Sequence, residues 1–394
     1  MSLLRLKKKG SPRNAFHLQL SVFALVSASF ANIYITQPVL PVLQQEFASD
    51  MVTVSMTVSA VILGIALSNL PFGFLADRWP IHPIIFIGGL LVSIGGLVCA
   101  ATYHLGVLIG ARFVQGLFIP ALTTCLAAYL AKALPAERLN VVMGSYVSAT
   151  VLGGLGGRLL GGWIHPPLHW RYAFVSAAVL TIAATMVALR GMPKLVALGF
   201  APKNPVGFIA LLRRWALLRL FFCAAGSFAV FSSIFNYLPF RLAGPPFGYS
   251  TQHITMLYLV YIVGIFIGPV SGRISNRFGS GTTLISGSLV LAAALAAVSM
   301  PSISAVVIGL IGICGGFFTV HAAAVGALNR KLTSGQGRAN ALYVLFYYVG
   351  GWLGITFSGL VYRQMGWSAV IVLGWLLLLI PMGAGLMERK NTWT

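Results

Sequence analysis

Long apolar stretches recur along almost the whole chain, and they restrict it to a protein that crosses a membrane many times. Twelve such stretches lie near residues 16–38, 52–75, 82–102, 105–131, 140–164, 171–190, 216–240, 254–273, 281–300, 303–328, 339–362 and 367–387. A hydrocarbon core about 30 Å thick requires roughly 20 apolar residues per helix. The sequence therefore predicts an all-α membrane protein with twelve transmembrane helices.

The composition excludes a water-soluble globule and several classes of function. Hydrophobic residues make up 58% of the chain and charged residues 8%, too few to cover a soluble surface. The net charge of +21 arises from short clusters between apolar runs, so we expect no nucleic-acid binding. The four cysteines lie in apolar stretches without CxxC spacing, and we expect no metal site, no disulfide framework and no cofactor.

The distribution of Lys and Arg predicts which side of the membrane each loop occupies. With the N-terminus in the cytoplasm, 21 of the 26 basic residues fall in cytoplasmic loops and tails. Three lie on the other side (Arg171, Arg241 and Arg363) and two within the membrane (Arg112 and Arg158). This bias follows the positive-inside rule. It predicts a multi-pass membrane protein with both termini in the cytoplasm.

The longest stretch without a convincing span, about residues 191–214, divides the predicted spans into six and six. It contains three prolines and ends in Arg213-Arg214, which is typical of a linker. The predicted organisation is a cytoplasmic tail (1–14), a six-helix bundle (15–191), a cytoplasmic linker (192–214), a second six-helix bundle (215–388) and a cytoplasmic tail (389–394).

Two sequence patterns occur once in each half. The segment from Gly73 to Asp77 and Arg78 returns as Gly272 to Asn276 and Arg277, with the two arginines 199 positions apart. Glycines of the fifth span (Gly153, Gly157, Gly161 and Gly162) correspond to Gly350, Gly354, Ser358 and Gly359 of the eleventh. Small residues four apart let helices approach closely in lipid. The repeat predicts two related bundles, an architecture of many secondary transporters.

These motifs resemble the major facilitator superfamily, and within it the twelve-span drug:proton antiporters. Gly73, Asp77 and Arg78 match the family's loop signature, and from Pro80 onward this sequence departs from it. The fourth span carries the family's Arg-x-x-Gln-Gly motif as Arg112, Gln115 and Gly116, and the fifth-span glycine motif is matched except that Arg158 replaces a proline. The resemblance implies two pseudo-symmetric six-helix bundles, alternating access and a location in the bacterial inner membrane.

The resemblance also implies a gating role for the repeated loop. The residues concerned are Gly73, Asp77 and Arg78 in one half and Asn276 and Arg277 in the other. A carboxylate and a guanidinium at the end of a span can pair with each other or with a helix terminus. The alternative is a solvated charge pair that only sets topology.

Arg112 and Arg158 are the strongest candidates for substrate binding, because a charge inside the membrane is expensive and usually faces a cavity or a partner. In the repeat they align with Ile311 and Ile355, so packing of the fold alone does not require them. The alternative is a structural arginine bonded to helix carbonyls or to Asn or Gln.

Further polar side chains in the spans complete the candidate site for substrate binding or coupling: Asn32, Gln37, Gln115, Asn236, His321 and Tyr347. A mostly apolar pocket with a few polar groups suits a small organic ligand. His321 can titrate near neutral pH, although it can equally be a packing residue. No acidic residue lies in a predicted span, which leaves open how protons would be coupled to transport.

The leading hypothesis is a monomeric secondary transporter, not an enzyme, that exports a small organic solute. Two embedded arginines without an embedded carboxylate favour anionic or neutral substrates. The transporter would be surrounded by membrane lipid, and the family resemblance implies protons as its coupling ion. One alternative is an importer or exchanger of metabolite anions, and another is a membrane receptor or scaffold that transports nothing.

Overall fold

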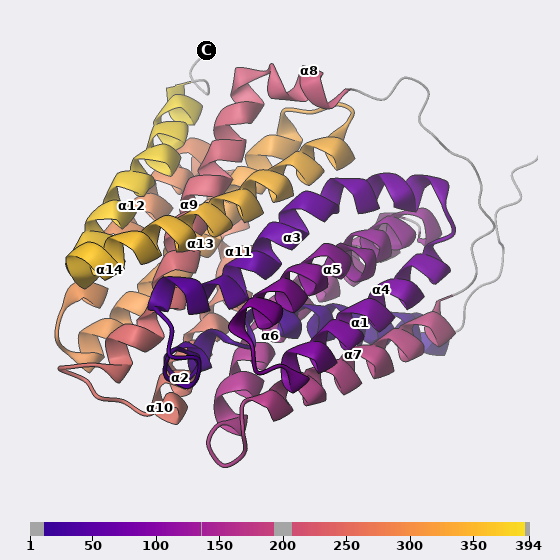
Figure 1. Cartoon of the computed structure of the whole chain (residues 1–394). Helices are drawn as coiled ribbons and strands as arrows, with labels where there is room; N and C mark the ends of the chain where they lie inside the picture. The colour runs from indigo at the N-terminus through magenta and orange to yellow at the C-terminus, as the bar shows by residue number, and fades with distance from the viewer. Residues whose placement is uncertain (1–11, 135, 193–206, 391–394) are drawn as a thin grey trace, which may run out of the picture.

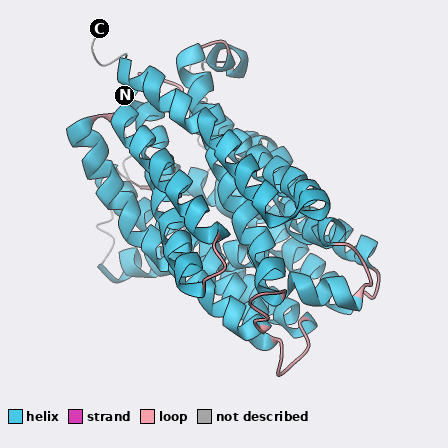
Figure 2. Cartoon of the chain, turned by 90° about the vertical axis from the view of Figure 1, so that its left-hand side faces the viewer, coloured by secondary structure: helices cyan, strands magenta, loops and turns pink. Residues whose placement is uncertain are grey.

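The computed structural model describes residues 12–134, 136–192 and 207–390, and every regular element in these ranges is a helix (Figures 1 and 2). The first half contains α1 (Pro12–Tyr34), η1 (Gln37–Val39), α2 (Leu40–Glu46), α3 (Met51–Arg78), α4 (Ile81–Ala101), α5 (Leu105–Ala133), α6 (Ala136–Ile164) and α7 (Arg171–Gly191). The second contains α8 (Phe208–Leu212), α9 (Trp215–Ala243), α10 (Thr251–Leu257), η2 (Tyr258–Tyr261), α11 (Ile262–Phe278), α12 (Ser280–Ser299), α13 (Ile303–Arg330) and α14 (Gln336–Lys390).

These helices make twelve membrane crossings in the described part of the chain. Ten helical segments are long and apolar enough to span a bilayer. One of them, α14, is two helices that meet at Gly366, whose φ of 79° lies in the left-handed region, where glycine alone is unstrained. The 29-residue α6 supplies the remaining crossing. The predicted all-helical, twelve-span fold is confirmed.

Two crossings differ from the uninterrupted helices predicted by their apolar patterns. The first continues beyond α1 through η1 and α2, and the eighth is divided into α10, η2 and α11. Most of the predicted linker and most of both predicted tails lie outside the described residues, but α1 already begins at Pro12, within the predicted tail 1–14. The start and end of the two bundles remain predictions.

The contacts among α1 to α7 are repeated among α9 to α14. In the first half α1 packs against α6, α3 against α5, and α4 against both α5 and α7. In the second half α9 packs against α14, α11 against α13, and α12 against both α13 and α14. The indigo-to-magenta helices and the rose-to-yellow helices accordingly form two bundles (Figure 1). The chain therefore folds as two pseudo-symmetric six-helix bundles.

Glycines make the equivalent close contact in each half. A Cβ added to Gly157 would clash with the carbonyl of Ala31 on α1, and one added to Gly354 would clash with the backbone of Ala229 on α9. Because lipid offers no hydrophobic drive for helix association, such close backbone approach provides the packing energy. The repeated glycines thus hold the same helix pair together in both bundles.

The two bundles meet most closely at one end of the molecule. Their helices come together near α2 and α10 and point apart toward α8 (Figure 1). These are called here the α2 end and the α8 end. At the α2 end Asp50 pairs with Arg363 at 3.7 Å, and Gln252 donates a hydrogen bond of 3.3 Å to the carbonyl of Pro166.

Burial along α3 changes in the same direction. Fourteen residues of this helix are buried, and all except Ala76 lie between Val52 and Asn69. The final turns therefore lack the cover that the other bundle gives to the beginning of the helix, where Val52 lies beside Gly359 of α14. The contact between the bundles is concentrated toward the α2 end.

Candidate functional site

Arg112, the first predicted intramembrane cation, is fully buried inside the first bundle. Its Nε donates to the carbonyl of Thr57 at 2.8 Å, Nη1 to Oε1 of Gln115 at 2.7 Å, and Nη2 to the carbonyl of Ile33 at 2.7 Å. These acceptors lie on α3, α5 and α1, so the guanidinium ties three helices of one bundle together. Its contacts match the structural alternative raised by the sequence.

Asn32 and Gln115 belong to the same internal network. The amide of Asn32 donates at 2.8 Å both to the carbonyl of Ala28 and to the hydroxyl of Thr181 on α7. Gln115 donates at 2.9 Å to the carbonyl of Val92 on α4. All these partners lie within the first bundle. The structure thus groups Arg112, Gln115 and Asn32 away from the interface between the bundles.

Arg158, the second predicted cation, lies at that interface and is 1% exposed. Its Nε donates to Oε1 of Gln37 at 2.7 Å and its Nη1 to the carbonyl of Gly154 at 2.7 Å. Its Nη2 donates to the hydroxyl of Tyr261 at 2.8 Å. Tyr261 belongs to η2 of the other bundle, so this arginine joins the two halves.

Aromatic rings surround the Arg158 guanidinium. Its central carbon lies 3.9 Å from the ring centre of Tyr34, 4.2 Å from that of Tyr261 and 5.4 Å from that of Tyr258. Rings at these distances attract a cation through their quadrupoles, more strongly where water is excluded. They supply part of the stabilisation that the charge loses on burial.

No carboxylate neutralises Arg158 among the described side chains. The four described acidic side chains pair elsewhere: Glu46 with Arg171, Asp50 with Arg363, Asp77 with Lys132, and Glu388 with both Arg219 and Lys331. A buried ion normally needs an opposite charge to offset its desolvation. Arg158 therefore places a net positive charge between the bundles.

Several buried polar atoms at this interface have no hydrogen-bond partner in the structure. They include Nε2 of Gln37 and both amide atoms of Asn236, two side chains with 0% exposure. Gln37 belongs to η1 and Asn236 to α9, and these two elements contact each other. Buried polar groups are nearly always paired. These atoms therefore mark where a ligand, water or another conformation would complete the bonding.

The second bundle faces the interface with an aromatic cluster that sequence reasoning largely missed. The rings of Phe228 and Tyr347 stack at 3.7 Å, and those of Phe231 and Phe317 at 4.0 Å. The ring of Tyr261 lies 5.5 Å from Phe231, which links the cluster to Arg158. We call Phe228, Phe231, Phe317, Tyr261 and Tyr347 the aromatic wall. Its sequence signal is the helical spacing of aromatic residues along α9.

His321 lies against this wall, which includes the predicted site residue Tyr347. Its Nδ1 is 3.1 Å from the hydroxyl of Tyr343, and its ring centre lies 5.4 Å from that of Tyr347. The structure thus brings His321 and Tyr347 together, and it places Arg158 and Gln37 at the same interface between the bundles.

The residues predicted to gate the first bundle lie at the α8 end. Lys132 of α5 contacts Asp77 at 3.2 Å and donates to the carbonyl of Ala76 at 2.7 Å. The Asp77 side chain is 69% exposed, and the guanidinium of Arg78 stacks on Phe74 at 3.9 Å. These contacts stay within one bundle. The third predicted residue, Gly73, is not tightly packed, because the nearest atom to an added Cβ is the methyl group of Thr124 at 3.9 Å.

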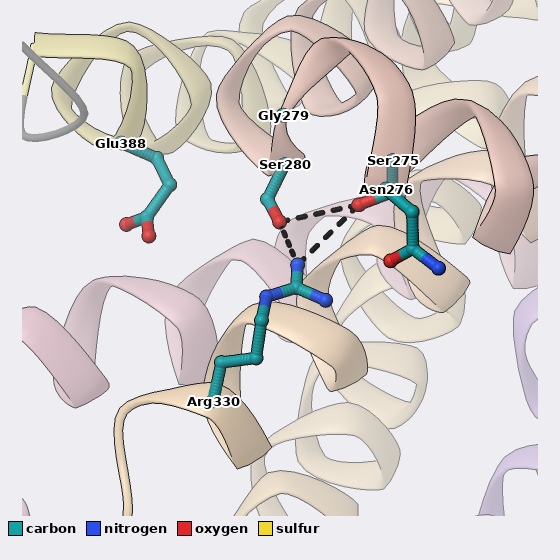
Figure 3. A pocket seen from close by; sticks show the side chains of 6 residues that line it. All are labelled: Ser275, Asn276, Gly279, Ser280, Arg330 and Glu388. Carbon is teal, nitrogen blue, oxygen red and sulfur yellow. Dashed lines mark hydrogen bonds between the residues drawn. The ribbon is translucent and has the colours of Figure 1, made fainter.

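In the second bundle Asn276 lines a small cavity at the α8 end (Figure 3). The guanidinium of Arg330 donates to the hydroxyls of Ser275 and Ser280, while Glu388 faces the same space. The guanidinium of Arg277 lies 5.1 Å from the ring centre of Phe278. The cavity volume of about 210 Å³ is below the roughly 300 Å³ of typical ligand sites.

Two repeated bundles with polar side chains buried at their interface form the architecture of a secondary membrane transporter. The family model described as Major Facilitator Superfamily matches residues 22–330. The chain therefore belongs to the Major Facilitator Superfamily, which confirms the predicted resemblance.

Relatives match nearly the whole chain. It is 26% identical over 383 residues to "Uncharacterized MFS-type transporter YybF" of Bacillus subtilis (strain 168), covering 95% of this chain and 94% of that one. It is 28% identical over 389 residues to "Inner membrane transport protein YnfM" of Escherichia coli (strain K12), covering 96% and 91%. The protein is thus a multi-pass membrane transporter related to bacterial inner-membrane transporters.

Solved structures share the fold at low sequence identity. A bacterial homolog to the human lysosomal transporter Spinster, in an inward-facing and occupied conformation, superposes with a TM-score of 0.77 at 16% identity, over 97% of this chain and 98% of that one. The human organic anion transporter MFSD10 (TETRAN) superposes with a TM-score of 0.73 at 16% identity, over 95% and 100%.

Proposed function

We propose that this transporter exports a small organic anion or neutral solute from the cytoplasm by alternating access. The observation that carries the proposal is Arg158, a buried cation between the bundles for which no described carboxylate serves as counter-ion. An uncompensated positive charge attracts anions and repels lipophilic cations. The aromatic wall beside it suits an organic molecule.

The structure corresponds, in this proposal, to the inward-facing state. The α8 end is assigned to the cytoplasm because the basic loops lie there under the positive-inside rule. Contacts between the bundles are concentrated at the opposite, α2 end. The resemblance in shape to an inward-facing homolog of Spinster supports the same assignment.

Proton coupling requires a titratable group that changes its access with the transport cycle. The described acidic side chains lie at helix ends or in loops. Among these residues, no carboxylate embedded in the membrane supplies the titratable group. His321, bonded to Tyr343 beside the aromatic wall, is the candidate we assign. In this scheme Asp77 and Arg78 of the first bundle, with Asn276 and Arg277 of the second, govern the α8-end gate.

Transport by purified protein in liposomes tests the proposal. A set of radiolabelled organic anions, neutral solutes and lipophilic cations is offered with and without an imposed pH gradient. We expect uptake of anions or neutral solutes that is lost in Arg158→Gln, whereas Gly156→Ala, at an open position, transports normally. Selective transport of cations that survives Arg158→Gln would refute the substrate class. A pH gradient without effect would refute proton coupling.

A further inference from the structure

The guanidinium of Arg158, which carries five N–H groups, donates three hydrogen bonds, and all three go to weak acceptors. Its acceptors are an amide, a backbone carbonyl and a phenol, namely Gln37, Gly154 and Tyr261. All three are neutral. An ionised carboxylate forms shorter and roughly twofold stronger hydrogen bonds with a guanidinium, often with both oxygens at once. A carboxylate that reached this site would therefore compete effectively with the neutral acceptors.

The unpaired atom beside Arg158 identifies the chemistry of the missing partner. Gln37 must turn its oxygen toward Arg158, because arginine can only donate. Its Nε2 is consequently left buried without a partner. An unsatisfied donor next to an uncompensated cation calls for an acceptor that carries negative charge. A carboxylate accepts through both oxygens and has no donor of its own when ionised.

The surroundings of the guanidinium identify the rest of the ligand. Tyr34 and Tyr261 lie 3.9 and 4.2 Å from the guanidinium carbon, and the ring of Phe231 lies 5.5 Å from that of Tyr261. Phe231 in turn stacks on Phe317. Aromatic pairs gain energy beyond the burial of their area. A planar ring attached to the carboxylate would extend this series of edge-to-face and stacked ring contacts.

We propose that Arg158 is the subsite for the carboxylate of an aromatic acid, and that this carboxylate displaces the Tyr261 hydroxyl from the arginine. The inference rests on the proposed function and names its substrate class. Tyr261 belongs to the second bundle and Arg158 to the first. Binding therefore removes a hydrogen bond between the bundles near their closed end, so the substrate lowers the cost of opening that end. A ligand shifts a conformational equilibrium only through such differential contacts.

Binding of small aromatic acids to the purified full-length protein tests this inference. The probes are benzoate and 2-naphthoate, with cyclohexanecarboxylate as an anion without a π-face and benzamide as an uncharged aromatic. Calorimetry should show that benzoate or 2-naphthoate binds more tightly than either comparison compound. In Arg158→Gln we expect affinity for the aromatic acid to fall by about tenfold or more. Equal binding of cyclohexanecarboxylate, or no binding of either aromatic acid, would overturn the proposal.

Tyr261→Phe distinguishes displacement from direct binding. The variant keeps the ring and removes the competing hydroxyl, so affinity for the aromatic acid should rise by about two- to tenfold. Tyr237→Phe is the control, because the Tyr237 hydroxyl donates at 2.9 Å to the carbonyl of Ile355 within the second bundle and not to Arg158. A lower or unchanged affinity in Tyr261→Phe, with folded protein, would show that the carboxylate does not displace the hydroxyl.

A labelling measurement separates failure of this inference from failure of the proposed function. Ser55 is buried on α3, and the four native cysteines are buried. In Ser55→Cys, an impermeant maleimide applied from the α2 end should react faster when benzoate is present. Arg158-dependent transport of other anions, without this acceleration, would leave the function standing and refute the aromatic-acid trigger.

Discussion

Arg158 of α6 donates a hydrogen bond of 2.8 Å to the hydroxyl of Tyr261, which belongs to η2 in the opposite bundle. The other buried arginine, Arg112, bonds only within its own bundle, to Thr57, Gln115 and Ile33. One cation thus holds a bundle together, whereas the other lies where the bundles must separate. The two arginines should respond differently to substitution.

Arg112→Gln should destabilise the protein whether or not a substrate is present. The change leaves the buried carbonyls of Thr57 and Ile33 without the arginine donor, and leaving a buried polar group unsatisfied costs about 1–3 kcal/mol. Thermal unfolding in detergent should show a clearly lower midpoint. Loss of transport with a midpoint equal to that of the wild type would contradict the structural role.

Gly157→Ala should disrupt the contact between α1 and α6. The added methyl group would clash with the Ala31 backbone, and overpacking of a tight contact typically costs about 1–3 kcal/mol. Gly156→Ala is the matched control, since no atom lies within 4 Å of its added Cβ. The yield of monodisperse protein after extraction reports the difference. Similar yields for both variants would refute the role of Gly157 in close packing.

Asp50 should make the folding stability of the protein sensitive to acid. It caps α3, and the hydrogen bond from the Thr53 hydroxyl is the main reason that its pKa is lowered. Because the folded pKa is depressed, this stabilisation is complete above the unfolded pKa of about 3.9 and is lost as the pH falls through the lower folded pKa.

Asp50→Ala tests the contribution of this cap. Removing an N-cap costs about 1 kcal/mol, while the half-exposed pair with Arg363 contributes less than that. We expect unfolding midpoints between pH 3 and 5 to vary less in Asp50→Ala than in the wild type. Asp50→Asn retains an acceptor for the cap and should be affected less than Asp50→Ala at pH 7. If the unfolding midpoints of wild type and Asp50→Ala depended on pH in the same way, Asp50 would not be the source of the acid sensitivity.

Lys132→Ala should alter transport more than stability. Its pair with Asp77 is exposed on both sides, and exposed ion pairs stabilise proteins by about 0–1 kcal/mol. If the pair acts in gating at the α8 end, the rate of transport should change while the unfolding midpoint moves little. Unchanged transport kinetics would assign Asp77 and Lys132 to topology only.

Reporter fusions should place residues 207 and 390 on the cytoplasmic side and residues 103 and 167 on the opposite side. The reason is the concentration of Lys and Arg at the α8 end. Alkaline phosphatase should be active only at the second pair of positions and a cytoplasmic fluorescent reporter only at the first. If both reporters were active at the same pair of fusion positions, the predicted twelve-span orientation would be rejected.

The sequence by itself determined the class of fold and its symmetry. Apolar stretches of membrane length leave a chain no other way to satisfy its backbone than helices that cross the bilayer. The loop motif shared by Asp77 and Asn276 and the glycines shared by α6 and α14 predicted two related bundles. This information is local or periodic, so it can be read without knowing which residues meet in space.

The tertiary structure alone decided which polar residues share a site. Arg112 and Arg158 look alike in the sequence, yet only Arg158 reaches the other bundle. Nothing local predicts that Gln37 and Tyr261 meet at one guanidinium, or that Phe231 stacks on Phe317. These contacts depend on how helices far apart in the chain pack against one another, and the contact of Arg158 with Tyr261 depends also on how the two bundles meet.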